Sequence, residues 1–283
     1  RDIASRFAEI DQVAQLNTRR VLEAFQAHRV SDGCLTGTTG YGYNDKGRET
    51  LDKIYADVFG AESALVRIGF VNGTHAITAA LFAGLKTGDT VLSVTGAPYD
   101  TLQGVIGITG NCPGSLKDYG IGYRQIDLLP SGEPDFEAIR EAAADKTVKT
   151  VFIQRSRGYT SRPALTVEKI GEICALVREV SPGANVVVDN CYGEFSETME
   201  PTHVGADLIA GSLIKNPGGG LAPTGGYVAG RADLVEAAAY RLTCPGIGGE
   251  CGATLSQNRL LFQGFFMAPH VVAQALKTAV FCA

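Results

Sequence analysis

The sequence of 283 residues lacks the patterns of several large classes of protein. Its seven cysteines include no Cys-x-x-Cys pair, which argues against a structural zinc site and against a disulfide framework. Its four histidines are scattered without the spacing of metal ligands, so we predict no metal site. The net charge of −5 contains no basic stripe that would attract nucleic acid. These absences exclude most metalloprotein and nucleic-acid-binding functions.

Membrane and export signals are also missing. No uninterrupted apolar run approaches the roughly 20 residues that cross a bilayer. The N-terminal residues lack the basic-then-apolar order of a signal peptide. We therefore expect a cytoplasmic protein that binds neither membranes nor nucleic acid.

Common nucleotide-binding and hydrolase motifs are absent as well. No G-x-x-x-x-G-K-[ST] occurs, and residues 84–87 lack the earlier glycine of that motif. The glycines at 37, 40 and 42 do not form a G-x-G-x-x-G after a strand, and no G-x-S-x-G is found. Phosphate-loop, dinucleotide-binding and serine-hydrolase interpretations are therefore disfavoured.

Instead, the chain contains a regular alternation of strand and helix patterns. Hydrophobic periodicity predicts helices over residues 2–29 and 48–59, separated by a polar, glycine-rich stretch that no packed helix would tolerate. We then predict strands at 63–67, 90–94, 122–126, 149–154, 185–189, 207–210 and 225–229. Further helices are expected at 73–86, 134–144, 166–180 and from about 253. This order is typical of an α/β fold with a mostly parallel seven-stranded sheet between helices.

The same pattern suggests three segments. They are an N-terminal helix with an interface segment (1–47), a large domain (48–252) and the start of a further domain (253–283). The chain opens on Arg1 rather than methionine and closes on an apolar stretch without a helix-ending signal. We therefore expect additional chain beyond the C-terminus.

Lys215 is the most informative residue, because it lies between an apolar run and three glycines. A buried amine can lose its proton and condense with an aldehyde. Asp189 ends a buried strand and suits the protonated nitrogen of a pyridine ring. Together with the hydroxyl of Ser212, these residues suggest pyridoxal phosphate. The alternatives are a surface lysine in a turn and an aspartate in a structural salt bridge or helix cap.

Other positions could complete such a site. Gly73 and Thr74 open a predicted helix and could cradle a phosphate, although an ordinary N-cap would look the same. His75 adjoins this cradle. Tyr99 follows a strand and could stack on a flat ring or simply pack a loop. Cys191, close to Asp189, is the one cysteine for which we consider a role beyond that of a buried thiol.

The order of these motifs resembles the fold-type I pyridoxal-phosphate enzymes, with their aspartate-aminotransferase-like large domain. Within them, the chain is similar to the cysteine and methionine metabolism group. It resembles in particular the aluminium-resistance or methionine gamma-lyase family, which is cystathionine beta-lyase-like. The resemblance covers essentially the whole chain and is carried by residues 40–45, 154–159, 189–195 and 211–220.

The resemblance implies a role for each matched residue. Lys215 would form the Schiff base with the cofactor, and Asp189 would hold the ring nitrogen. Phosphate binding would fall to the cradle residues, and ring stacking to Tyr99. Residues at a dimer interface would reach the partner's phosphate, and residues after the fourth strand would touch the ring or the substrate. The residues concerned are, for phosphate, Gly73, Thr74, His75 and Ser212; for the interface, Tyr41, Tyr43 and Arg48; and, for the ring or substrate, Gln154 and Arg155.

We therefore predict a carbon–sulfur lyase that acts on a sulfur-containing amino acid of the cystathionine or methionine type. Lys215 would abstract the α-proton, and Tyr99 and Asp189 would complete the catalytic set. We expect a homodimer or homotetramer with most of the family's C-terminal small domain missing. Transamination, racemisation and aldol cleavage remain open, as does a non-catalytic, cofactor-binding stress protein. Direct aluminium chelation is not expected, because no carboxylate cluster is evident.

Overall fold

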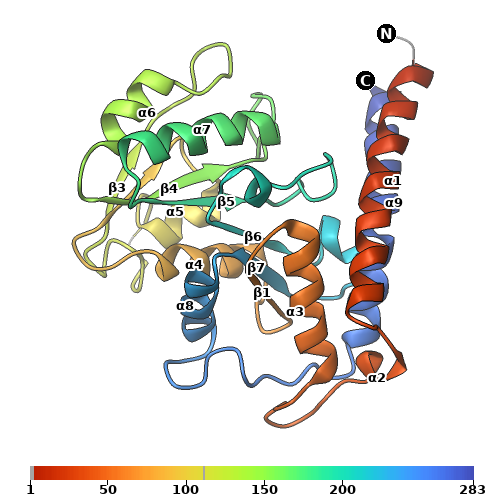
Figure 1. Cartoon of the computed structure of the whole chain (residues 1–283). Helices are drawn as coiled ribbons and strands as arrows, with labels where there is room; N and C mark the ends of the chain where they lie inside the picture. The colour runs from red at the N-terminus through yellow and green to blue at the C-terminus, as the bar shows by residue number, and fades with distance from the viewer. Residues whose placement is uncertain (1–2, 111) are drawn as a thin grey trace.

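A seven-stranded sheet with helices on both faces forms the centre of the molecule (Figure 1). The computed structural model describes residues 3–110 and 112–283. The strand order is β1-β7-β6-β5-β4-β2-β3, and only β7 runs antiparallel to its neighbours. The strands are β1 (Ser63–Arg67), β2 (Thr90–Ser93), β3 (Gly122–Gln125), β4 (Val148–Gln154), β5 (Asn185–Asp189), β6 (Leu208–Ser212) and β7 (Gly226–Gly230). The predicted fold class is confirmed, and all seven predicted strands are present.

Each face of the sheet has its own hydrophobic core. One core includes the aromatic residues Tyr55, Phe59 and Phe265. The other is formed mainly by aliphatic residues such as Ile77 and Leu234. Helices α4 (Gly73–Ala83), α5 (Asp100–Ile106) and α8 (Ala232–Leu242) contribute to the aliphatic core, whereas α3 (Lys46–Phe59), α6 (Phe136–Ala143) and α7 (Val167–Val180) contribute to the aromatic one. The central strands are buried on both sides, which is why they read as continuous apolar runs.

Four of the predicted helices have clear start signals, whereas two of the helices that the sequence missed do not. Asp45, Asn72, Asp135 and Thr166 each cap a predicted helix by accepting a hydrogen bond from a backbone N–H. The unpredicted helices α5 and α8 begin without any side-chain cap. Without a cap, a short helix directly after a strand is hard to detect from the sequence.

Two further differences concern the glycine-rich stretches. A short helix, α2 (Asp32–Leu35), lies in the segment where no helix was expected. The last helix, α9 (Asn258–Cys282), begins later than residue 253. Leu255 and Ser256 have φ values of 50° and 62°, and these left-handed conformations prevent a right-handed helix from starting earlier.

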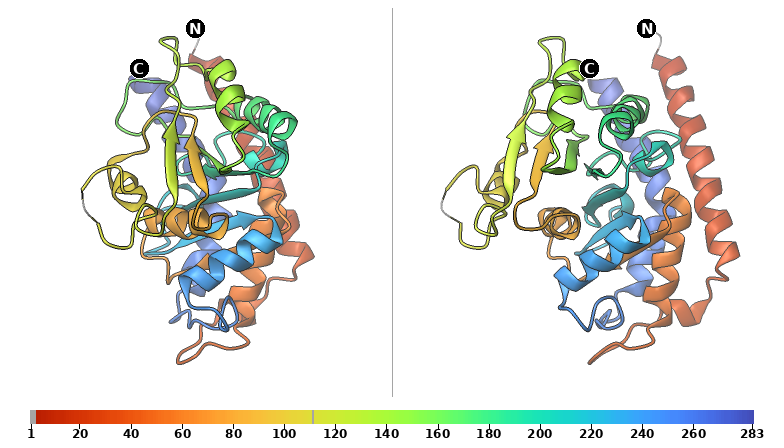
Figure 2. Two further views of the ribbon diagram at one scale, coloured as in Figure 1. Left: turned by 90° about the vertical axis from the view of Figure 1, so that its left-hand side faces the viewer. Right: turned by 60° about the vertical axis from the view of Figure 1, so that its left-hand side comes forward.

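Helices α1 (Ile3–Ala27) and α9 lie side by side at one edge of the molecule (Figures 1 and 2). The ring of Phe25 lies 5.8 Å from that of Phe262, and Phe265 stacks on Tyr55 of α3 at 3.9 Å. The first and last predicted segments are therefore in mutual contact, and the proposed division at residues 47 and 252 stays a prediction.

Helix α9 is also the only helix in the described part of the chain that is long and apolar enough to cross a bilayer. The sequence analysis overlooked it because polar residues interrupt the apolar run. This statement rests on length and composition alone, and a core helix of a soluble protein can have the same length and composition. One such helix is weak support for a membrane span.

Candidate active site

The carboxyl-end loops of β2, β4, β5 and β6 surround a cavity of about 450 Å³. Parallel strands end at the same edge of a sheet, so residues far apart in sequence meet there. Asp189 is the last residue of β5, and Lys215 follows β6 as the N-cap of the short 3-10 helix η2 (Asn216–Gly218). The cavity is lined by Tyr99, Asp100, Thr101, Gln154, Ser156, Gly158, Tyr159, Asp189, Cys191, Tyr192 and Lys215.

The amine of Lys215 is half-buried, and its Nζ lies 4.2 Å from the centroid of the Tyr192 ring. Burial lowers the pKa of Lys215, but Cys191, Tyr192 and Asp189 together outweigh burial and raise the pKa above its usual value. Burial also raises the pKa of Cys191 and keeps it a neutral thiol. The sequence-based idea that burial would favour loss of the proton from this amine is therefore corrected, because the net effect of its surroundings is to raise the pKa of Lys215.

Asp189 is almost completely buried, with 2% of its surface exposed. Burial raises the pKa of Asp189, and this rise is opposed by hydrogen bonds from Cys191 and by the charge of Lys215. The backbone N–H of Cys191 donates to Oδ1 at 3.0 Å. A buried carboxylate of this kind favours a partner that brings a proton or positive charge.

The start of α4 provides features that suit a phosphate group. The side chain of Asn72 caps the helix by accepting a hydrogen bond from the N–H of His75 at 2.9 Å. Facing Gly73, the Oγ of Ser212 is buried and has no hydrogen-bond partner among the described residues. A Cβ atom at Gly73 would lie only 3.2 Å from Cys191 Sγ and from Ser212 Cβ. A helix N-terminus, a free buried hydroxyl and a glycine at close approach together fit an anionic group.

Tyr99 connects this cradle to the cavity. Its hydroxyl donates to Thr74 Oγ1 at 3.0 Å, and its backbone N–H donates to Gln154 Oε1 at 2.9 Å. Burial raises the pKa of Tyr99, and the nearby charge of Asp189 adds to the rise. The phenol is therefore neutral. The predicted residues Lys215, Asp189, Tyr99 and Gln154 all face one cavity, with Thr74 hydrogen-bonded to its wall.

His75 points away from this cavity. Its Nδ1 accepts a hydrogen bond from the Val71 N–H at 3.2 Å, and its ring packs edge-on against Phe70. Burial lowers the pKa of His75, so the ring is neutral. A direct role for this side chain in holding a phosphate is not supported by its position.

The predicted interface residues are not near the cavity-lining set of their own chain. Tyr41 and Tyr43 are 77% and 55% exposed, and their ring centroids are 5.9 Å apart. Arg48, in contrast, is only 1% exposed. Its guanidinium donates to the backbone carbonyls of Gly42, Glu250 and Gly252. In the single chain this side chain holds its own chain's loops together, and a role for Arg48 at a partner's phosphate stays a prediction.

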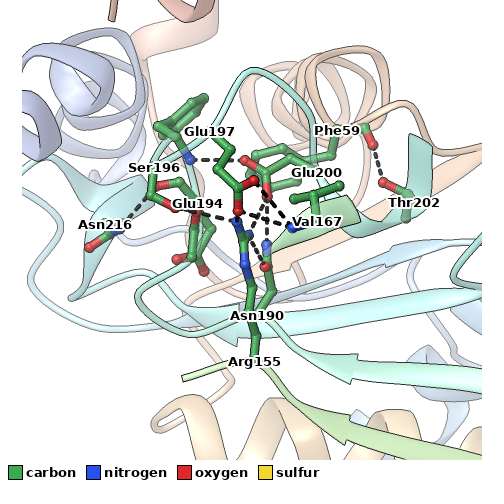
Figure 3. Close-up of polar contacts among 12 residues, drawn as sticks. Phe59, Arg155, Val167, Asn190, Glu194, Ser196, Glu197, Glu200, Thr202 and Asn216 are labelled. Atoms are coloured by element: carbon green, nitrogen blue, oxygen red, sulfur yellow. Dashed lines mark hydrogen bonds and ion pairs between the residues drawn. The ribbon is translucent and has the colours of Figure 1, made fainter. Parts of the chain in front are cut away.

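Arg155 also differs from its predicted role (Figure 3). It donates to Asn190 Oδ1 at 2.7 Å, to Glu197 Oε1 at 2.7 Å and to Glu200 Oε2 at 3.3 Å. It is 2% exposed and does not line the cavity. Arg155 therefore supports the turn after β5 from behind, instead of contacting a ring or a substrate.

The sequence analysis missed two residues in this turn, Tyr192 and Glu194. Tyr192 is 61% exposed and lines the cavity. Glu194 is fully buried, and burial raises its pKa to about 8. The Tyr227 hydroxyl donates to Glu194 Oε1 at 2.7 Å, and Oε2 has no partner among the described residues. The only sequence signal for either residue is its place directly after the strand that ends in Asp189.

Comparison with known proteins relates the whole chain to one family model. The model, described as methionine gamma-lyase, matches residues 1–283. An uncharacterised protein of Bacillus subtilis is 53% identical over 283 residues, which are 100% of this chain and 67% of that protein. The crystal structure of a carbon-sulfur lyase involved in aluminium resistance from Clostridium novyi NT has a TM-score of 0.96 and 54% identity. The match covers 99% of this chain and 67% of that one.

A more distant relative has a described activity. The L-methionine gamma-lyase of Pseudomonas putida is 28% identical over 234 residues, which are 82% of this chain and 53% of that protein. The chain thus spans about two thirds of the length of its nearer relatives and about half of this one. The comparisons support the fold-type I architecture that the resemblance implied.

Proposed function

Because this chain belongs to the methionine gamma-lyase family, we propose that it carries the cofactor-binding part of a pyridoxal-phosphate-dependent carbon–sulfur lyase. Its substrate would be a sulfur-containing amino acid of the cystathionine or methionine type. The observation that carries the proposal is the meeting of Lys215, Asp189 and the unpartnered Ser212 hydroxyl around one cavity and its glycine cradle. The relatives' names support the reaction class, and the choice of substrate is ours.

The residues present fit the cofactor group by group. Pyridoxal phosphate, when bound, supplies an aldehyde that captures amines and a ring that accepts electron density from the α-carbon. Lys215 would provide the amine for that aldehyde and would take the α-proton at Nζ. Asp189 would hold the ring nitrogen. Ser212 Oγ and the first N–H groups of α4 would bind the phosphate, and Tyr99 would pack against the ring.

The chemistry of Lys215 requires a change in its protonation. The amine must release its proton before it can attack an aldehyde or accept the α-proton. Burial lowers the pKa of this amine, and Cys191, Tyr192 and Asp189 raise it above its usual value. A positively charged group paired with Asp189 would reduce the effect of that carboxylate on the amine, and would thereby favour release of the proton from Nζ.

We propose in addition that the protein assembles as a homodimer or homotetramer with its sites at the interface. The exposed pair Tyr41 and Tyr43 supports this, because two adjacent exposed aromatic residues suit burial against another chain. Light scattering coupled to size-exclusion chromatography measures the assembly. Replacing both tyrosines by serine is expected to weaken it, and an unchanged mass would remove this role.

The central test of the function is the absorbance spectrum of protein mixed with pyridoxal phosphate. We expect a near-visible band that borohydride removes and that fixes the cofactor to the peptide containing Lys215. Lys215→Ala should abolish the band, whereas Lys149→Ala, which changes an exposed lysine on β4, should retain it. A Lys215→Ala variant that keeps the borohydride-sensitive band would falsify the central assignment.

The reaction class is tested separately with three substrates. Incubation with cystathionine, methionine and alanine, followed by assays for pyruvate, 2-oxobutyrate and free thiol, distinguishes elimination from transamination and racemisation. A lyase releases a keto acid and a thiol from a sulfur substrate. A protein that binds the cofactor but releases neither product from any substrate fits the non-catalytic alternative.

A further inference from the structure

The turn that follows β5, residues 190–196, adopts an unusual backbone conformation. Tyr192 has a φ of 67° and Phe195 a φ of 61°, although neither residue is glycine. For bulky side chains the left-handed region is strained, so it persists only where the surroundings impose it. Such outliers are concentrated at functional sites, and this one lies directly after Asp189.

The buried network in Figure 3 imposes the conformation from behind. Glu200 Oε1 accepts the N–H of Phe195 at 2.8 Å, and Glu200 Oε2 accepts Asn190 Nδ2 at 2.9 Å. Arg155 ties Asn190 to Glu197 across the same region. The two ends of the turn are thus fixed by buried, charge-assisted hydrogen bonds, which are stronger than neutral ones.

On its front side, the turn contacts both Lys215 and the residue after it. The Tyr192 ring lies beneath the Lys215 ammonium, 4.2 Å from Nζ. Asn216 Nδ2 donates to the backbone carbonyl of Glu194 at 2.9 Å. Since the network fixes the turn and Asn216 ties the turn to the lysine loop, the backbone of Tyr192 is held beside Lys215.

We propose that Tyr192 is a positioning residue whose ring face holds the Lys215 side chain in the cavity and favours its ammonium form. The inference rests on the proposed function only in taking Lys215 as the reactive amine. The physical basis is the attraction between a cation and the negative face of an aromatic ring, which is strongest where water is partly excluded. The phenol hydroxyl is not needed for this attraction.

Other groups also face the amine of Lys215. The variants of Tyr192 leave these groups unchanged, so they isolate the effect of the ring. Asp189 contributes a carboxylate from β5, and Cys191 contributes a neutral thiol from the turn. Tyr99, Asp100 and Tyr159 line the rest of the cavity. Burial lowers the pKa of Lys215, and Cys191, Tyr192 and Asp189 raise it. Because a cation is attracted to the face of a ring 4.2 Å away, removing the ring while keeping an apolar side chain should lower the pKa of Lys215.

The test measures the reactivity of Lys215 directly, without cofactor. The protein is treated with formaldehyde and cyanoborohydride over a series of pH values, and modification of the Lys215 peptide is quantified by mass spectrometry. The exposed Lys149 in the same sample is the internal reference. Tyr192→Phe keeps the ring, and Tyr192→Leu removes it while keeping a β-carbon in the same backbone conformation.

We expect wild type and Tyr192→Phe to reach half-modification at the same pH. Tyr192→Leu should reach it about 0.4 to 0.7 pH units lower, which is the shift that a partly exposed cation–π contact produces. Tyr192→Met, another apolar residue without a ring, should behave like Tyr192→Leu and replaces it if the leucine variant does not show a native circular dichroism spectrum.

Two results overturn the inference. Either the leucine and methionine variants titrate like wild type, or the phenylalanine variant shifts as far as they do and thereby assigns the effect to the hydroxyl. Neither result depends on cofactor binding. If the borohydride test with Lys215→Ala fails while the titration shift is found, the proposed function falls and the role of Tyr192 stands.

Discussion

Arg155 and Lys215 are two cationic residues on opposite sides of the same turn, and their surroundings differ. Arg155 is buried and donates to two carboxylates, an amide oxygen and a hydroxyl. Lys215 lines a cavity together with the Tyr192 ring and the Asp189 carboxylate, which is proposed to bind a ligand. The hydrogen-bond partners of Arg155 all belong to the fold. The contacts of Lys215, in contrast, lie at a cavity where a bound ligand would replace them. The comparison separates a supporting side of the turn from a reactive one.

The largest expected effect is on the supporting side. Arg155→Met removes the positive partner of Glu200 and leaves that carboxylate buried without compensation. We expect a loss of about 3–5 kcal/mol in the free energy of unfolding. Urea denaturation measures it, and Arg140→Met, which breaks an exposed pair with Glu179, is the control with a much smaller effect. If both variants lose the same free energy of unfolding, Arg155 does not support the turn more than an exposed ion pair does.

The next effect concerns pH and Glu194. Burial raises the pKa of this carboxyl to about 8, so the folded protein binds its proton more tightly than the unfolded chain does. Its contribution to stability is complete below the unfolded pKa of about 4.3 and is lost as the pH rises through about 8. Glu194→Gln cannot ionise, and its stability should fall about 2 kcal/mol less than that of wild type between about pH 6 and about pH 8. Unfolding measured at each pH gives the stability of both proteins. If the wild type and Glu194→Gln lose the same stability over this range, the assignment is contradicted.

Ser212→Ala tests whether the reactive side keeps a polar atom for a ligand. The hydroxyl is buried without a partner, so its removal should stabilise the cofactor-free protein by about 1 kcal/mol or more. The same change should weaken binding of pyridoxal phosphate by about tenfold, since one hydrogen bond to an anion is lost. Thermal unfolding and a cofactor titration measure the two effects. Loss of stability together with unchanged binding indicates an ordinary structural serine.

The smallest change in stability is expected for Lys215→Met. The side chain is half-buried, and its ring contact is worth about 0.5–1 kcal/mol, which the apolar methionine partly replaces. Urea denaturation should therefore give nearly the wild-type free energy of unfolding, although the cofactor band is lost. A loss as large as that of Arg155→Met means that Lys215, too, is part of the supporting structure.

The sequence predicted those parts of the site that follow from topology. Tyr99 was predicted at the sheet edge where ligands bind, Asp189 at the end of a buried strand, and the cradle at Gly73 from a helix start after a strand. These inferences need only the order of strands and helices.

The roles of Arg48, Arg155 and Tyr192 could not be predicted, for different reasons. Arg48 and Arg155 bind groups that are distant in sequence, and an arginine after a strand looks the same whether it faces a ligand or a carboxylate. The direction of the Tyr192 ring depends on a left-handed backbone conformation that its residue type does not signal. The partners of a charged residue, unlike the ends of a strand, are a property of the completed fold.

The loop that carries Lys215 connects β6 to the antiparallel strand β7 and passes under α9. Its ends are joined by the hydrogen bond from the Leu213 N–H to the Gly225 carbonyl. In its middle, the backbones of Gly219 and Gly264 are so close that a Cβ atom at Gly219 would lie 2.2 Å from the Gly264 carbonyl oxygen. Helix α9 therefore cannot slide along its axis without displacing this loop. We therefore expect a displacement of the C-terminal helix to move this loop and, with it, Lys215.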